Sequence, residues 1–131
     1  VGSFGLECLS RGAAGVTFLE SYKEVLTILK KNIDNLKQQN YSKVIEKDIF
    51  AENTLKLLDN KFDIIFIDPP FKEKKLVDLL SRIIKLKLLK DNGVIIVHRH
   101  KKEVDTFPNE FNLIVSKNYG ISKIIFGNTL T

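Results

Sequence analysis

Hydrophobic and polar positions alternate between two periods along the chain. Apolar runs of strand length lie at 16–19, 43–46, 62–67 and 94–97. Between these runs, apolar residues recur at helical spacing, which predicts helices over 4–9, 21–39, 52–58 and 76–84. Alternating strands and helices are typical of an α/β fold with a mostly parallel sheet and helices on both faces.

Local signals predict where several of these elements begin and end. Ser21 followed by Glu24 has the spacing of a capping box, so we expect Ser21 to start the second helix. Asn92-Gly93 predicts a turn before the strand at 94–97. The alternation from 112 to 126 is interrupted at Tyr119-Gly120, which predicts a C-terminal antiparallel hairpin.

Composition narrows the class of protein. The chain has 131 residues, of which 44% are hydrophobic and 28% charged, so we expect a single domain over 1–131. The apolar runs are too short to cross a bilayer, and no secretory leader opens the chain. Cys8, the one cysteine, cannot form an intrachain disulfide. These features favour a cytoplasmic domain with no membrane partner, and a monomer is the default expectation.

The charge is compatible with a nucleic-acid partner but does not establish one. The formal net charge is +5, from 21 basic and 16 acidic residues. Most of the basic residues are Lys, and Ile and Asn are also plentiful, which is the pattern of an AT-rich coding bias. The net charge alone therefore does not decide whether the partner is a nucleic acid.

Three carboxylates follow predicted strands, at the sheet edge where α/β folds bind ligands. They are Glu20, Asp48 and Asp68. Gly2 and Gly5 are spaced as the last two glycines of a G-x-G-x-x-G loop, and Glu20 lies about where an acid that binds a ribose diol is expected. Two glycines before a helix are also common in a tight turn, so this spacing alone leaves a cofactor site open.

Asp68-Pro69-Pro70-Phe71 is the sharpest signal in the sequence. Two prolines fix φ at both positions and remove two amide donors, so the chain leaves the strand in one rigid geometry. The Asp68 carboxylate and the Pro69 carbonyl are then available as acceptors, and Phe71 offers an aromatic face. Two acceptors beside a flat apolar ring suit the exocyclic amine of a planar base.

The chain resembles the bacterial 16S ribosomal RNA guanine-N2 methyltransferases over essentially its whole length. Asp68-Pro69-Pro70-Phe71 resembles their catalytic motif, although enzymes that methylate adenine N6 share it. The matching stretches elsewhere are Gly2–Glu7, Leu9–Ala13, Val16–Glu20 and Tyr119–Ile124.

The resemblance implies a Rossmann-like class I methyltransferase domain that uses S-adenosylmethionine, yields S-adenosylhomocysteine and needs no metal. It implies that 16S RNA or a small-subunit assembly particle is the substrate. By the same resemblance, Asp68, Pro69 and Phe71 would hold the target guanine, and Pro70 belongs to the same catalytic motif. The cofactor would contact Gly2, Gly5, Glu20, Asp48, Ile49 and Phe50. Family members carry a strand before the glycine loop, and this chain begins inside that loop. We therefore expect the first strand of the family fold to be missing.

Basic residues flank the proposed site and would hold phosphates without reading sequence. They are Lys72, Lys74, Lys75, Arg99, Lys101 and Lys102, and a solvated charged loop explains them equally well. His98 and His100 share a strand face but lack a third ligand, so we expect no metal site.

Two alternatives to the guanine-N2 activity remain open. One is an adenine-N6 methyltransferase acting on DNA or RNA, and the other is an inactive RNA-binding remnant. The missing strand favours the remnant, or a fragment of a longer protein, whereas the intact Asp68-Pro69-Pro70-Phe71 segment argues against an inactive chain.

Overall fold

The computed structural model describes residues 2–51, 53–58, 60–70 and 75–129. The chain forms two compact units, over residues 1–54 and 55–131. Among the described residues, no helix is long and apolar enough to cross a membrane.

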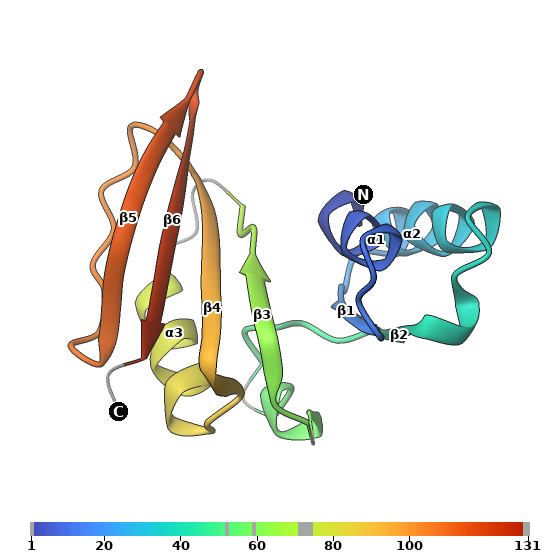
Figure 1. The fold of residues 1–131 in the computed structure, drawn as a ribbon, viewed down its shortest axis with the longest axis horizontal. Helices are drawn as coiled ribbons and strands as arrows, with labels where there is room; N and C mark the ends of the chain where they lie inside the picture. The colour runs from blue at the N-terminus through green and yellow to red at the C-terminus, as the bar shows by residue number, and fades with distance from the viewer. Residues whose placement is uncertain (1, 52, 59, 71–74, 130–131) are drawn as a thin grey trace. The chain divides into compact units, whose positions relative to one another are not determined.

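The first unit packs two helices on a short parallel sheet (Figure 1). It contains α1 (Ser3–Ser10), β1 (Val16–Leu19), α2 (Lys23–Asn35), the 3-10 helix η1 (Gln39–Tyr41) and β2 (Ser42–Ile45). β1 pairs in parallel with β2, from Val16 opposite Ser42 to Leu19 opposite Ile45. Its core is formed by residues from both helices and the strands they cover: Leu6, Leu9, Leu29 and Ile33, with Val16, Phe18 and Val44 against them.

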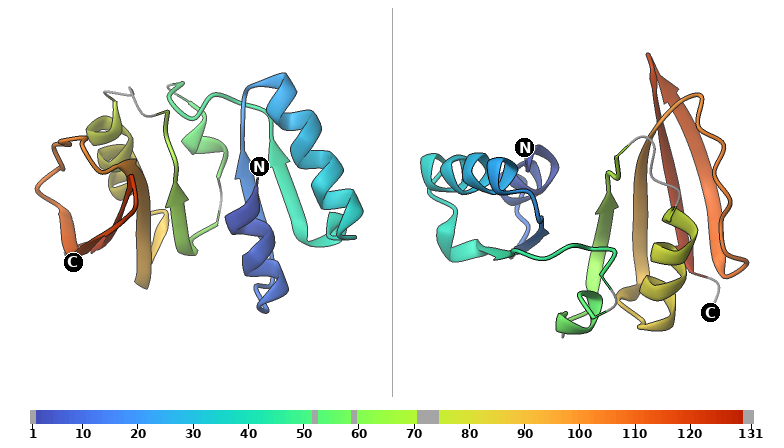
Figure 2. Two further views of the ribbon diagram at one scale, coloured as in Figure 1. Left: turned by 90° about the horizontal axis from the view of Figure 1, so that it is seen from above. Right: turned by 180° about the vertical axis from the view of Figure 1, so that it is seen from behind.

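The second unit is a four-stranded mixed sheet with a helix on one face (Figure 2). It contains the 3-10 helix η2 (Leu55–Leu57), β3 (Phe62–Ile67), α3 (Leu76–Lys85), β4 (Leu89–His100), β5 (Phe111–Tyr119) and β6 (Ser122–Thr129). The strand order is β3-β4-β6-β5. β3 and β4 run parallel, whereas β6 is antiparallel to both β4 and β5. The largest fully buried side chains are Leu76 and Leu80 of α3 and Ile95 and Val97 of β4.

The predicted α/β class and the C-terminal hairpin are confirmed. The hairpin closes at Gly120, whose φ of +57° places it in the left-handed region that glycine adopts without strain. Its register pairs Tyr119 with Ser122.

Two local predictions were wrong. Asn92-Gly93 is no turn, because β4 runs through it from Leu89 to His100 with a register irregularity opposite Phe62 and Ile64. A Cβ at position 93 would lie 2.6 Å from Leu89 Cδ1 and 3.0 Å from the Asp63 carbonyl oxygen, so this glycine permits a close strand contact.

The predicted capping box is also absent. The N-cap of α2 is Tyr22, and no side chain caps the helix there. Instead Glu20 Oε2 accepts hydrogen bonds from the amides of Ser21 at 2.9 Å and Tyr22 at 3.3 Å. The predicted helix over 52–58 is reduced to η2, and residue 52 lies outside the described residues.

Candidate active site

Glu20 and Asp48 follow the two paired strands of the first unit. β1 and β2 are parallel, and the Glu20 amide donates to the Ile45 carbonyl at 3.1 Å, so both acids lie at the same carboxyl edge. Oε1 of Glu20 accepts no hydrogen bond from any residue that the structure describes. The Asp48 carboxylate accepts the Phe50 amide at 2.9 Å, which closes a local turn. The half-buried Glu20 and the exposed Asp48 therefore both offer carboxylate oxygens as acceptors at one edge.

The glycines of the predicted loop have packing roles in α1. Gly2 is the N-cap, with φ of +72°, and a Cβ there would lie 2.4 Å from Leu29 Cδ1. A Cβ on Gly5 would lie 2.5 Å from the Phe18 ring, so the absence of a side chain lets α1 approach β1. Ile49 and Phe50 are half-buried after β2.

Asp68 lies directly after β3 in the second unit, and one of the described residues forms a hydrogen bond with its carboxylate. Oδ1 is 2.9 Å from His98 Nδ1 on β4, and His98 Nε2 is 2.9 Å from the Ser122 hydroxyl at the start of β6. The side chains of Asp68 and His98 are 58% and 35% exposed, so the pair lies at the surface. The structure thus places an accessible, anchored carboxylate at the strand end that the sequence predicted.

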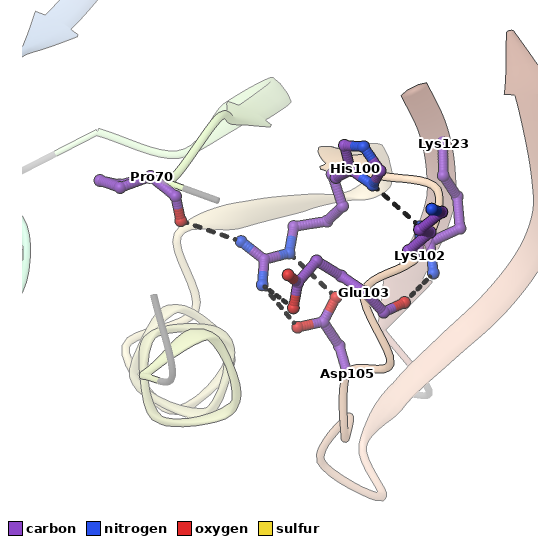
Figure 3. A network of polar contacts seen from close by, with 7 residues as sticks. Pro70, His100, Lys102, Glu103, Asp105 and Lys123 are labelled. Carbon is purple, nitrogen blue, oxygen red and sulfur yellow. Dashed lines mark hydrogen bonds and ion pairs between the residues drawn. The ribbon is translucent and has the colours of Figure 1, made fainter. Parts of the chain in front are cut away.

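Arg99 is placed differently from the prediction. Its side chain is 1% exposed, and Nε and Nη2 donate to the two carboxylate oxygens of Asp105, each at 2.9 Å. Nη2 also lies 3.6 Å from a Glu103 oxygen, and Nη1 donates to the Pro70 carbonyl at 3.2 Å. Figure 3 shows Pro70, Glu103 and Asp105 around this network. Because a guanidinium enclosed in this way does not reach a phosphate, Arg99 leaves the set of predicted RNA contacts.

The remaining predicted RNA contacts are exposed where they are described. Lys75 precedes α3, and Lys101 and Lys102 lie in the turn after β4. The Lys102 amide donates to His100 Nδ1 at 3.1 Å, a contact that Figure 3 includes. Phe71, Lys72 and Lys74 lie outside the described residues.

Sequence reasoning missed Ser122 and Asp105. Ser122 meets His98 because β6 runs antiparallel to β4, with His98 opposite Ile124, so Ser122 is a diagonal neighbour on the same face. No local pattern gives that register. Asp105 lies six residues after Arg99, and an acid at that spacing in a loop carries no signal of pairing.

Comparison with known proteins gives a consistent set of relatives. The chain is 37% identical over 123 residues to the ribosomal RNA small subunit methyltransferase D of Haemophilus influenzae, a match that covers 92% of this chain and 63% of the relative. The protein of that name from Buchnera aphidicola subsp. Acyrthosiphon pisum is 36% identical over 129 residues, a match that covers 93% of this chain and 59% of the relative. The chain thus spans about three fifths of the length of these curated relatives.

Solved structures agree on the fold. A candidate methylase from Haemophilus influenzae superposes with a TM-score of 0.82 at 34% identity, covering 99% of this chain and 81% of that one. The ribosomal protein L11 methylase of Lactobacillus delbrueckii gives a TM-score of 0.77 at 17% identity, covering 98% and 64%, which shows the fold alone. The expected resemblance to small-subunit ribosomal RNA methyltransferases and the methyltransferase fold are therefore confirmed.

The family model described as "Conserved hypothetical protein 95" matches residues 1–128. This match spans both units of the structure. The chain belongs to the conserved hypothetical protein 95 family.

Proposed function

We propose that this protein transfers a methyl group from S-adenosylmethionine to the exocyclic N2 amine of a guanine in 16S ribosomal RNA, free or within a small-subunit assembly particle. The observation that carries the proposal is the accessible Asp68 carboxylate, which leaves β3 at the head of a Pro-Pro segment and is anchored by His98. The names of the curated relatives support an RNA substrate.

The first unit suits the cofactor. A ribose diol offers two O–H donors, and Glu20 presents an oxygen that is unbonded within the described part of the chain. Asp48, Ile49 and Phe50 would contact the adenine, and Gly2 and Gly5 would line the methionine portion. When bound, the cofactor supplies an activated methyl group on a sulfonium, so the protein has no electrophile to generate.

The second unit suits the amine. Asp68 and the Pro69 carbonyl would accept the two N–H bonds of the guanine amine, whose lone pair is otherwise delocalised into the ring. Acceptors placed there favour a more tetrahedral nitrogen and stabilise the positive charge that develops on it. As the N–C bond forms and the S–C bond breaks, one amine proton passes to Asp68 or to water. Phe71 would stack on the base, and Lys75, Lys101 and Lys102, with Lys72 and Lys74, would hold phosphates.

Binding is the first test of the cofactor half. S-adenosylmethionine and S-adenosylhomocysteine are titrated calorimetrically into the wild-type protein, into Glu20→Ala, and into Asp34→Ala as a matched control. Asp34 is an exposed acid on α2, away from the carboxyl edge of the sheet. We expect binding in the wild type and the control and its loss in Glu20→Ala. Absence of binding in the wild type would contradict the proposal for this chain.

Product analysis is the test of the substrate half. Protein-free 16S RNA, small-subunit particles and DNA are each incubated with labelled S-adenosylmethionine, and the digested nucleosides are separated. N2-methylguanosine from RNA is the expected product. N6-methyladenine would establish the alternative chemistry, and cofactor and RNA binding without any methylated product would identify an inactive remnant.

A further inference from the structure

Three neighbouring strands bring Asp68, His98 and Ser122 into one hydrogen-bonded chain. β3 and β4 are parallel with Ile67 opposite Val97, so the next residues, Asp68 and His98, also lie side by side. β6 runs the opposite way and begins at Ser122, beside the end of β4. The imidazole therefore bridges the exit of one strand and the entry of another.

The partners of the imidazole define where its proton lies. A carboxylate only accepts hydrogen bonds, so His98 Nδ1 carries the hydrogen that is shared with Asp68 Oδ1. In the neutral ring Nε2 is then the acceptor, and the rotatable Ser122 hydroxyl donates to it. Each ring nitrogen has a partner, so both the tautomer and the ring orientation are set.

The contact with His98 fixes the orientation of the Asp68 carboxylate and engages one of its two oxygens. His98 occupies Oδ1, and it is the one described residue that bonds to Asp68, so Oδ2 remains available. A carboxylate that is 58% exposed and without such a contact would rotate freely in water, and its orientation would have to be fixed during each turnover.

We propose that His98, held by Ser122, is a positioning residue that orients Asp68 toward the substrate amine. The inference rests on the proposed function in that it takes Asp68 as the acceptor of an amine N–H. Beyond that function, we assign His98 and Ser122 as the residues that fix the orientation of Asp68, and Oδ2 as the oxygen that accepts the amine N–H. Productive orientation of reacting groups contributes to the rate of such an enzyme, and a misplacement of about 1 Å can cost about 10²-fold.

The first test measures the tautomer and needs no activity. The chain contains two histidines, so ¹⁵N spectra of the imidazoles report both sites without ambiguity. His98 should show a protonated Nδ1, whereas His100, whose Nδ1 accepts the Lys102 amide, should show a protonated Nε2 and serves as the internal control. Asp68→Asn and Ser122→Ala should each shift the His98 signals and leave those of His100 in place. A His98 ring with mixed tautomers, or one that is insensitive to both substitutions, overturns the proposed contact.

The second test separates positioning from RNA binding. His98→Ala should lower kcat for RNA methylation by about 10- to 100-fold, with the KM for RNA and the affinity for S-adenosylmethionine unchanged. His98→Gln, whose amide can still donate to Asp68, should recover part of the loss, and His100→Ala should remain within twofold of the wild type. In an Asp68→Asn background, His98→Ala should cause no further loss.

The outcomes distinguish this inference from the proposed function. A change confined to the KM for RNA, or full additivity with Asp68→Asn, overturns the positioning role of His98 while the methyltransferase proposal stands. A wild-type protein that binds no cofactor and methylates no RNA overturns the proposed function and, with it, the positioning of Asp68 for methyl transfer by His98. The tautomer measurement then still decides whether His98 holds Asp68.

Discussion

Asp68 is the residue on which the proposed chemistry most directly depends. Asp68→Ala removes both carboxylate oxygens while the Pro-Pro segment that follows is kept, so we expect methyl transfer to fall by at least about 10²-fold. Binding of S-adenosylmethionine should be nearly unchanged. Single-turnover assays and calorimetry on the same sample measure the two quantities. Turnover within threefold of the wild type in Asp68→Ala would contradict the role that we assign to this residue.

The buried Arg99, which donates to the Pro70 carbonyl, should contribute to the free energy of unfolding. Arg99→Met removes the guanidinium and leaves Asp105 and Glu103 without their cation, and an uncompensated buried charge typically costs about 3–5 kcal/mol. Chemical denaturation should show a loss of this order, and Lys101→Met, at an exposed neighbour, should change the free energy of unfolding little. A loss below about 1 kcal/mol in Arg99→Met would show that the network contributes little to stability.

Cys8 gives a prediction that depends on pH. Burial, and to a lesser degree the nearby Glu7 carboxylate, raise the pKa of the Cys8 thiol. A raised pKa lowers the thiolate fraction at a given pH, so alkylation by iodoacetamide near pH 8 should be slower than for an unhindered cysteine and should increase at higher pH. Glu7→Gln removes the smaller cause and should accelerate the reaction modestly. An equal rate in the folded protein and in the urea-unfolded chain would contradict this prediction.

The acid at each strand end could be predicted from the sequence, but its partners could not. Asp68 follows an apolar run and precedes two prolines, which are local features. The bond from His98 to Ser122 depends on strand register, and the burial of Arg99 depends on an acid supplied by a loop. In a sequence, an arginine among lysines has the same appearance whether it lies in solvent or in the interior, which is why Arg99 was placed among the RNA contacts.

At the scale of elements, the hairpin depends on one close contact. Gly127 on β6 lies against the buried Phe111 at the start of β5, and a Cβ at position 127 would be 2.1 Å from the Phe111 ring. Gly127→Ala therefore overpacks this corner and should destabilise the protein by about 1–3 kcal/mol in denaturant titrations.

Two further variants make the origin of that effect testable. Phe111→Leu combined with Gly127→Ala should recover part of the loss, because a smaller side chain relieves the contact. Gly15→Ala should be near neutral, because a Cβ there lies 3.6 Å from the Tyr41 carbonyl oxygen, at ordinary contact distance. If Gly127→Ala changes the free energy of unfolding as little as Gly15→Ala does, the close packing of Gly127 against Phe111 does not limit stability.

Element types could be predicted better than element ends. The apolar runs placed β1, β2 and β3 to within a residue or two, because each is bounded by polar residues. β4 is longer than its apolar run, since Lys90, Asp91 and Asn92 are exposed members of a strand that the sequence presents as a polar turn. The start of α2 was missed because the Glu20 carboxylate accepts the amides there, in place of Ser21.

At the scale of the whole molecule, ligand binding should be visible as stability. A ligand that binds only the folded chain at about 100 times its Kd adds about 2.7 kcal/mol to the free energy of unfolding. S-adenosylhomocysteine should therefore raise the midpoint of thermal unfolding in the wild type and in Asp68→Ala, and leave that of Glu20→Ala unchanged. An equal rise in all three proteins would place the cofactor away from Glu20.

The family could be predicted from the sequence because its signals are contiguous. The Asp-Pro-Pro-Phe segment and the Gly2–Glu7 stretch each lie within a few residues, and the fold and the relatives agree with the family they indicated. The methylated base could not be predicted from this segment, since enzymes that methylate adenine N6 share the Asp-Pro-Pro-Phe motif.

The reversal of strand direction between β4 and β6 also orders events during synthesis. Ser122 is made 54 residues after Asp68, an interval of roughly 3 to 11 s at ordinary translation rates. Until β6 has emerged and paired, His98 lacks the hydroxyl that fixes its ring, and the Asp68 carboxylate lacks a fixed orientation. We therefore expect Asp68 to reach its final orientation only after β6, the most C-terminal strand that the structure describes, has joined the sheet.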